Sequence, residues 1–544
     1  MRHTVSGGAA RAAAAVSVAA LVLAACSSID TPSGGGQSPT ADDRAAKNGG
    51  TLVVALSDEP DPLDPTTART LVGRSVFMSI CEKLYDINAK LEIVPQLAAS
   101  MPQIAADGKT VTIKLRSGVK FADGTPMDAA AVKTSLDRDL TLPTSARKSD
   151  LASVDSVSVT DPSTVVLHLK APFAPLIAQL ADRAGMVMSP AALKSEGTNF
   201  GAHPVCVGPF KFQSRVAQDH IDVVKDANYY DASNVHLDKV SYKIIADSTI
   251  RFNNLRSGDV QVLDTVAATD VDALQADSNL QLLSSESLGY QGITVNIGNA
   301  SGVGKPAAAL PAKLNSKMAT DPRVRQAFEL SLDRDAINKV VFQGKFASAC
   351  GPISPASPFS SDAAQACSKH DPAAAKSLLQ QAGAQTPFKI DMIIANAPVN
   401  LRLGQAIQAQ AKDGGFDVRL VPTEFASALD QTDAGDYQMF QVGWSGRVDP
   451  DGNISNFVHS EGSQNNNGYA SSTVDSLLEK SQTTQDQSTR SDLFGQVITQ
   501  LQKDLPIIYL YRQKNFTGVS RKVVGVQMYG DGLMRFAHAG FATG

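Results

Sequence analysis

The sequence is poor in the residues that most often build metal and redox sites. Its 544 residues include 8 histidines, 5 cysteines and 1 tryptophan. The histidines are scattered, and no H-E-x-x-H, C-x-x-C, Walker-type or dinucleotide-binding glycine pattern occurs. These motifs carry the common metal, thiol and nucleotide chemistry of proteins. We therefore expect neither a metal site nor a cofactor.

Long apolar runs and blocks of basic residues are also missing. Crossing a bilayer takes about 20 apolar residues. After the first 25 residues no run reaches that length, and a segment such as 505–511 has the length of a core strand. The formal charge is −5. Nucleic acid is therefore not an expected partner, since its binding proteins carry basic patches.

The N-terminal segment has the pattern of an export signal. Basic residues precede the apolar residues 12–25, as in secretory signal peptides. The run ends in Leu-Ala-Ala-Cys, which resembles the bacterial lipoprotein signal and implies lipid attachment at Cys26. The alternative is an ordinary cleaved signal. We expect a signal peptide at 1–25, a lipid-anchored flexible tether at 26–50, and a location on the extracytoplasmic face of the cytoplasmic membrane.

Four cysteines follow Cys26, an even number in an oxidising compartment. Cys350 and Cys367 bracket a loop rich in proline and serine, which makes them the natural local pair. Closing that loop contributes about 3 kcal/mol in the chain-entropy model. Cys81 and Cys206 then pair by elimination, with two buried free thiols as the alternative.

Periodicity and capping residues predict a large α/β chain. Val111, Ile113 and Leu115 alternate with polar residues, as in a half-buried strand. Asp128 is a candidate helix cap, and Asp321 and Asp371 each precede a proline at a helix start. The helix after Asp371 is expected to end at Gly383. Further strands are expected at 52–56, 240–245, 389–394 and 437–444.

Several segments together resemble a known family. Residues 107–126, Asp-Gly-Lys-Thr-Val-Thr-Ile-Lys-Leu-Arg-Ser-Gly-Val-Lys-Phe-Ala-Asp-Gly-Thr-Pro, resemble the signature of the extracellular solute-binding proteins of family 5. These are the dipeptide- and oligopeptide-binding receptors of ABC importers. Further matches follow in the family's order at 207–212, 228–230, 237–240, 255–260, 321–328, 333–337 and 443–446. The resemblance covers essentially residues 50–544.

The resemblance implies a two-lobed α/β fold, that of the type II, cluster C periplasmic binding proteins, with a subdomain inserted in the first lobe. Such a receptor closes over a short peptide and delivers it to a separate permease and ATPase. It is expected to be a monomer, to contact the membrane through its lipid anchor only, and not to be an enzyme. The expected division is lobe I at 51–84, 204–296 and 505–544, the subdomain at 85–203, and lobe II at 297–504.

Two charged positions of the family's site can be compared. Arg402 lies at a position that resembles the one where dipeptide receptors of the family carry an arginine. The resemblance implies that Arg402 binds the peptide carboxylate. The alternative is a solvated or locally paired arginine. The best-known peptide receptors have an aspartate three residues after the tryptophan, where this chain has Arg447. Asp449, and then Asp451, are the nearest substitutes as amine anchors, and both could instead cap turns.

The segment Gly443-Trp444-Ser445-Gly446 is expected at a strand end on the ligand site. Its glycines would let a ligand main chain pair with the strand. Trp444 is either a pocket wall or a core residue. If Arg447 faces the cleft, the ligand carries extra negative charge, as in acidic peptides, a glutathione-like molecule or a haem propionate. A metal chelate is a further alternative ligand.

An exported hydrolase is the competing class. Residues 443–447 fail the G-x-S-x-G nucleophile pattern because the fifth residue is Arg447 and not glycine. A lipoprotein scaffold that has the fold but binds only protein partners is a third class.

Overall fold

The computed structural model describes residues 44–305, 309–312, 314 and 316–543. The chain divides into two compact units, Met1–Gly35 and Gly36–Gly544, and every described residue belongs to the second. The predicted signal peptide, lipidated Cys26 and residues 26–43 of the tether lie outside the described residues.

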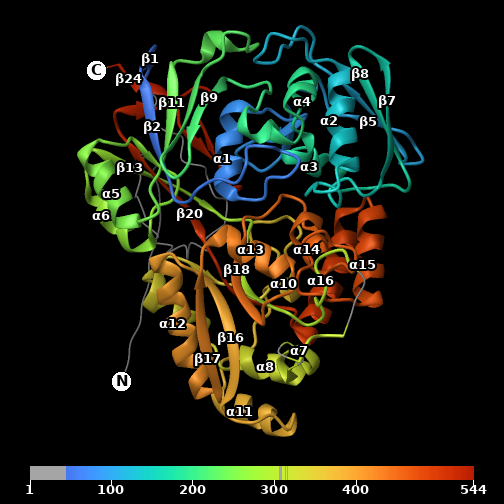
Figure 1. The fold of residues 1–544 in the computed structure, drawn as a ribbon, viewed down its shortest axis with the longest axis vertical. Helices are drawn as coiled ribbons and strands as arrows, with labels where there is room; N and C mark the ends of the chain where they lie inside the picture. Colours follow the sequence, from blue (N-terminus) through green and yellow to red (C-terminus); the bar gives the residue numbers. More distant parts are fainter. Residues whose placement is uncertain (1–43, 306–308, 313, 315, 544) are drawn as a thin grey trace, which may run out of the picture. The chain divides into compact units, whose positions relative to one another are not determined.

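A seven-stranded sheet forms the first part of the core. Its central strand β2 (Thr51–Leu56) pairs in parallel with β11 and β12. Four of its six residues are buried, as expected for a parallel strand that is covered on both faces. The sheet order is β13 (Leu280–Glu286), β20 (Lys514–Ser520), β12 (Val262–Leu263), β2, β11 (Lys239–Ile244), β10 (His220–Lys225) and β9 (Phe210–Val216), seen in the upper left of Figure 1.

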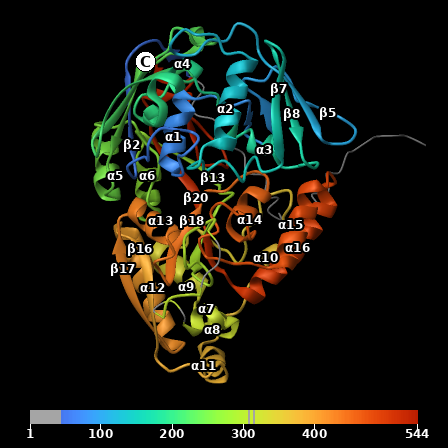
Figure 2. The same ribbon diagram turned by 45° about the vertical axis from the view of Figure 1, so that its right-hand side comes forward.

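A six-stranded sheet forms the second part. Strand β16 pairs in parallel with β17 along its whole length, and α12 (Pro398–Asp413) connects the two. Figures 1 and 2 both show α12 beside β16 and β17. The sheet order is β15 (Ala347–Ser348), β19 (Ile507–Arg512), β14 (Tyr290–Val295), β18 (Met439–Trp444), β16 (Phe388–Ala395) and β17 (Phe416–Thr423).

The chain passes between these sheets at two connections. Residues 287–289 lead from β13 to β14, and Gln513 leads from β19 back to β20. The lobe boundaries expected from the sequence, at 296/297 and 504/505, lie on the far sides of β14 and β19. The two connections are therefore the places where pairing changes from one sheet to the other.

A separate four-stranded sheet lies within the segment expected to be the inserted subdomain. It contains the alternating strand predicted around Val111, and α2 (Ala129–Thr141) packs against β7 and β8. The sheet order is β5 (Gln103–Ile104), β6 (Thr110–Lys114), β8 (Thr164–Leu169) and β7 (Val154–Asp161).

The predicted helix starts are confirmed by their caps. The Asp128 carboxylate accepts the amide of Ala131 at 3.0 Å at the start of α2. Asp321 and Asp371 do the same for α8 (Pro322–Leu330) and α11 (Pro372–Gln381). Gly383 has a φ of +62°, the left-handed conformation expected after a helix end. These side chains satisfy amides that have no partner within the helix.

The remaining elements complete the layers around the sheets. In Figure 2, α14, α15 and α16 lie together, beneath α3. The other helices are α1 (Leu71–Ile80), α3 (Leu176–Gln179), α4 (Pro190–Glu196), α5 (Ser248–Ser257), α6 (Val271–Ala276), α7 (Lys317–Thr320), α9 (Arg334–Phe342), α10 (Asp362–Gln365), α13 (Phe425–Asp433), α14 (Asp451–Val458), α15 (Ser472–Thr483) and α16 (Gln487–Asp504), with 3₁₀ turns at Arg183–Gly185, Gly197–Ala202, Ala232–Asn234 and Ala268–Asp270. The short strands are β1 (Ala46–Lys47), β3 (Tyr85–Ile87), β4 (Ile93–Pro95), β21 (Val523–Val524), β22 (Gln527–Met528), β23 (Met534–Arg535) and β24 (Gly540–Ala542). Across the part of the chain that the structure describes, the helices are too short or too polar to cross a membrane.

Both disulfides predicted from the sequence are present. Cys81 pairs with Cys206, which ties the end of α1 to the segment before β9. Cys350 pairs with Cys367 and closes the loop rich in proline and serine.

Candidate ligand-binding site

A cavity of about 580 Å³ is lined by segments from both large sheets. Its volume lies within the range of about 300 to 1,000 Å³ typical of small-molecule sites. The wall consists of Ser57, Asp58, Arg69, Thr70, Leu71, Ala246, Asp247, Tyr290, Gln291, Thr294, Ala395, Asn396, Ala397, Pro398, Asn400, Glu424, Phe425, Leu429, Phe440, Gln441, Val442, Gly443, Trp444, Ser445, Phe457, Gln464, Asn466, Ile507 and Gln513.

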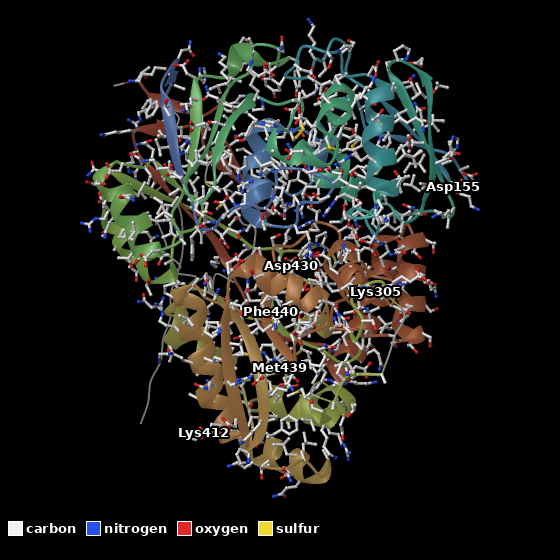
Figure 3. All side chains as sticks on the ribbon, viewed as in Figure 1. Asp155, Lys305, Lys412, Asp430, Met439 and Phe440 are labelled. Carbon is white, nitrogen blue, oxygen red and sulfur yellow. A yellow bond between two sulfur atoms is a disulfide. The ribbon has the colours of Figure 1, made fainter. Side chains whose placement is uncertain are left out.

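Strand β18 contributes a continuous stretch of this wall, from Phe440 to Trp444. Figure 3 labels Phe440 and Met439 on β18, below Asp430 of α13. On one side the strand pairs with β14 as far as Trp444, whereas its pairing with β16 ends at Phe440. Among the described residues no strand pairs with that second side from Gln441 to Trp444. This edge leaves main-chain groups available to an extended ligand.

Trp444 both lines the cavity and packs into the protein. Its indole Nε1 donates a hydrogen bond to Oδ1 of Asn453 at 3.1 Å. The ring of Trp444 contacts Phe457 edge-on, with 4.8 Å between the ring centroids. The guanidinium carbon of Arg447 lies 4.2 Å from the centroid of the Trp444 ring. The sequence left open whether Trp444 is a pocket wall or a core residue. In the structure it is both.

Arg447 does not line the cavity. Its side chain is only 10% exposed and forms an ion pair with Asp182, which also accepts a hydrogen bond from Nε of Arg74 at 3.1 Å. Burial, together with the nearby Arg74, lowers the pKa of Arg447 to about 9. Burial would raise the pKa of Asp182, but the guanidinium groups of Arg447 and Arg74 hold it well below its usual range. The position of Arg447 therefore gives no support for an extra negative charge on the ligand.

Asp449 and Asp451 also lie outside the cavity wall. Asp449 is 8% exposed and accepts two hydrogen bonds from Arg490, at 2.7 and 2.8 Å. Asp451 accepts from Ser455 and from Gln482, and burial raises its pKa to about 6. Both carboxylates are thus engaged inside the protein and are not placed to receive a ligand ammonium group.

The glycines around Trp444 have a packing explanation. A Cβ atom at Gly443 would lie 2.2 Å from the side chain of Gln291 on β14. Gly446 has a φ of +85°, and its Cβ would lie 2.3 Å from the carbonyl carbon of Leu288, in the connection between the two sheets. A side chain at Gly446 would collide with the main chain of that connection, whereas one at Gly443 would require the end of the Gln291 side chain to move.

Arg402 is exposed on α12 and does not line the cavity, although Pro398 and Asn400 of the same helix do. The structure thus brings Gly443, Trp444 and Ser445 together in the cavity wall. It places Arg402, Gly446, Arg447 and Asp449 elsewhere.

Four charged residues that no sequence motif indicated line the cavity, namely Asp58, Arg69, Asp247 and Glu424. Asp58 and Asp247 follow the carboxyl ends of β2 and β11, which are parallel neighbours. Ligand sites of open α/β sheets gather at this edge. Their position just after the carboxyl ends of predicted strands could therefore have identified Asp58 and Asp247 as candidate site residues.

Arg69 is the one basic residue of the wall. Its guanidinium group forms an ion pair with Asp433, at the end of α13, and its main-chain amide is bound by Asp61. Across the described residues, no cluster of three or more histidine, cysteine, aspartate or glutamate side chains is arranged to hold a metal ion.

The mixed α/β fold, with a ligand-sized cavity lined by segments from two large sheets, is that of the type II, cluster C periplasmic binding proteins. Residues 92–465 match the model of the family described as "Bacterial extracellular solute-binding proteins, family 5 Middle", and the chain belongs to this family. Its members bind small ligands and work with the permease and ATPase components of ABC importers.

Curated relatives and solved structures agree with this assignment. The chain is 27% identical over 501 residues to the glutathione-binding protein GsiB of Pectobacterium atrosepticum, covering 90% of this chain and 93% of that protein. The PBP AgaA of A. tumefaciens R10, solved with agropinic acid, has a TM-score of 0.81 and 27% identity, covering 91% and 99% of the two chains. DppA of Helicobacter pylori, solved with the peptide STSA, has a TM-score of 0.82 at 24% identity over 91% and 99%, which shows the shared fold.

Proposed function

We propose that this protein is the substrate-binding lipoprotein of an ABC importer and that it captures short peptides. The observation that carries the proposal is the unpaired edge of β18 from Gln441 to Trp444 on the wall of the cavity. An extended peptide added to this edge would gain main-chain hydrogen bonds without any requirement on its side chains. Trp444 would form an apolar wall for one of them.

Capture would involve closure of two lobes around the cavity. In this proposal the lobes are the predicted segments 51–84, 204–296 and 505–544 against 297–504, with 85–203 as the inserted subdomain. The exception is that β14 and β19 move with the second lobe, because both pair within the six-stranded sheet. The connections at 287–289 and at Gln513 would serve as the hinge, because among the described residues only these two connections join one large sheet to the other. A peptide that contacts both lobes would favour the closed form by its difference in affinity.

The rest of the receptor account is proposed with it. The protein would act as a monomer, held to the membrane only by lipid on Cys26, and would release the peptide to its permease chemically unchanged. An exported hydrolase is disfavoured because the Gly443–Arg447 segment does not form a nucleophile elbow: Ser445 accepts hydrogen bonds from Arg74 and Arg447 and has no histidine partner among the described residues.

Glutathione is the second candidate ligand. The observation that favours it is the similarity along 90% of this chain to proteins named glutathione-binding. Haem and metal chelates are alternatives that the sequence raised. The similarity to AgaA also extends the range of ligands to be tested to small organic acids.

The test compares peptides that can and cannot pair with a strand. Isothermal titration calorimetry is carried out with a neutral tripeptide and with analogues N-methylated at single peptide bonds, beside glutathione, haem and nickel–histidine. Each main-chain hydrogen bond is worth about 1 kcal/mol, so methylation at a pairing position is expected to weaken binding about fivefold to tenfold. If every methylated analogue bound as tightly as the unmodified tripeptide, peptide capture along β18 would be rejected. Tight binding of haem or nickel–histidine without binding of any peptide would also reject it. Peptides recovered after long incubation are expected to be intact.

A further inference from the structure

The charges on the cavity wall are strongly unequal. Three carboxylates, those of Asp58, Asp247 and Glu424, face one basic residue, Arg69. None of the three forms an ion pair with any described residue. The wall therefore carries three carboxylates that have no ion-pair partner among the described residues.

The hydrogen bonds of these carboxylates hold them in place and leave their charge uncompensated. Asp247 caps α5 by accepting the amide of Ile250 at 2.9 Å. Glu424 caps α13 by accepting the amides of Ala426 and Ser427 at 3.0 and 2.8 Å. Asp58 accepts the amide of Glu59 at 2.8 Å. Helix amides stabilise an anion, but each contributes only a partial charge.

Two of the three carboxylates line the same cavity although they follow strands of different sheets. Asp58 follows β2 and Glu424 follows β17. Burial raises the pKa of Asp58, and the charges of Glu424 and of the buried Asp264 raise it further. A cationic group bound at this position would relieve that repulsion.

The basic residue of the wall is already engaged. Arg69 contacts both carboxylate oxygens of Asp433, one of them from Nη2 at 3.3 Å. A ligand carboxylate would have to displace Asp433 to pair with this guanidinium group. The available charge in the cavity is therefore acidic.

The inner wall supplies polar groups that also point to a ligand. Tyr290 is 4% exposed and Thr294 is 6% exposed, and both line the cavity. Their side chains add hydroxyl groups to the residues of the wall, and a hydroxyl group can both donate and accept a hydrogen bond with a bound molecule.

We propose that the cavity selects cationic peptides, those in which ammonium and guanidinium groups outnumber carboxylates. A lysine or arginine side chain would lie between Asp58 and Glu424, with the peptide main chain along β18. The proposal rests on the proposed peptide capture and adds the class of peptide. The sequence suggested, from Arg447, a ligand with extra negative charge. The proposed preference is for a ligand with positive charge.

The test measures the affinities of three tripeptides that differ at one residue, Ala-Lys-Ala, Ala-Gln-Ala and Ala-Glu-Ala, by calorimetry at low and moderate salt. The 1,5-diaminopentane dication is included as a cation without a peptide bond. Opposite charges near a protein surface attract one another, although part of the gain is lost in removing them from water. We expect the lysine peptide to bind about tenfold more tightly than the glutamine peptide, and the glutamate peptide to bind most weakly. Because exposed charges are screened, the preference is expected to shrink as salt is raised.

Three variants locate the effect. Asp58→Asn and Glu424→Gln keep the shape and the accepting oxygen, and each is expected to reduce the preference for lysine over glutamine about threefold or more. Asp417→Asn, at an exposed position on β17 outside the cavity wall, is the matched control and is expected to leave it unchanged.

The outcomes separate the two proposals. Equal binding of the lysine, glutamine and glutamate peptides overturns the charge preference and leaves peptide capture standing. Binding of diaminopentane with no binding of any peptide supports the acidic site and overturns peptide capture. Failure of every ligand overturns both, and an unchanged preference in both cavity variants overturns the assignment to Asp58 and Glu424.

Discussion

Arg447 and Asp182 form a buried ion pair between segments that are far apart in the sequence. Arg447 follows β18 of the six-stranded sheet, and Asp182 lies between α3 and the 3₁₀ turn at Arg183–Gly185. Arg74 of α1 joins them, because it contacts Asp182 and donates to Oγ of Ser445 at 3.2 Å. The charges around Ser445 thus hold the end of β18 against the rest of the protein, beside the cavity.

Breaking this pair is expected to destabilise the protein strongly. Asp182→Asn leaves the buried guanidinium groups of Arg74 and Arg447 without their carboxylate. Arg447→Met leaves the buried charge of Asp182 with one of its two guanidinium partners removed. Removing one partner of a buried pair typically costs about 3 to 5 kcal/mol of unfolding free energy.

Urea unfolding of both single variants and of the double variant measures the coupling. The double variant is expected to lose less than the sum of the single losses. Additive losses would mean that Arg447 and Asp182 do not stabilise one another.

The exposed position of Arg402 leads to a prediction about peptide carboxylates. Since Arg402 lies outside the cavity wall, Arg402→Ala is expected to change the affinity for free-acid peptides and for their C-terminal amides by no more than about twofold. Trp444→Ala is the comparison, and it is expected to weaken both classes at least tenfold because it removes a wall aromatic. A loss confined to the free-acid peptides in Arg402→Ala would restore the carboxylate-binding role expected from the sequence.

The two disulfides are expected to contribute unequally to stability. The Cys81–Cys206 bridge spans 125 residues and the Cys350–Cys367 bridge spans 17. Loop-closure entropy predicts a cost of about 5 kcal/mol for the first and about 3 kcal/mol for the second. Thermal and urea unfolding of the two double serine variants give the comparison. A greater loss in the variant without the short bridge would contradict the entropic account.

Glu82 is expected to make stability depend on pH. Its carboxyl group is buried beside the hydroxyls of Tyr229 and Tyr230, at 2.6 and 2.9 Å, and burial raises its pKa to about 7 from 4.5. The folded protein keeps a proton that the unfolded chain loses between these values. The contribution of Glu82 is therefore full below about pH 4.5 and is lost as the pH rises through about 7.

A comparison of the protein with Glu82→Gln isolates this effect. The unfolding free energy of the unchanged protein should fall between pH 4.5 and pH 7.5 by on the order of 3 kcal/mol more than that of the variant. Parallel pH profiles of the two proteins would show that Glu82 does not titrate in this range.

Much of the fold follows from local sequence signals. Asp128, Asp321 and Asp371 satisfy helix amides within three residues, and the alternation around Val111 identifies a strand face without any distant partner. The cysteine pairs were also within reach, since the number of cysteines leaves few combinations.

The charges of the site could not be predicted in the same way. Whether Arg447 faces a ligand depends on Asp182, and whether Asp449 is available depends on Arg490, and neither partner is close in the sequence. Asp58 and Glu424 meet at the cavity only because two sheets are brought together. Such pairings depend on tertiary packing, which residue spacing does not determine.

The central claim is that peptides bind in the cavity beside Trp444, and the fluorescence of Trp444 tests it most directly. Trp444 is the one tryptophan of the chain, and it lines the cavity, so its emission reports from the site itself. Titration with a cationic tripeptide should change the emission in a saturable way, at one peptide per chain and with the dissociation constant found by calorimetry. Calorimetric binding of the peptide at one per chain with no change in the emission of Trp444 would contradict the claim.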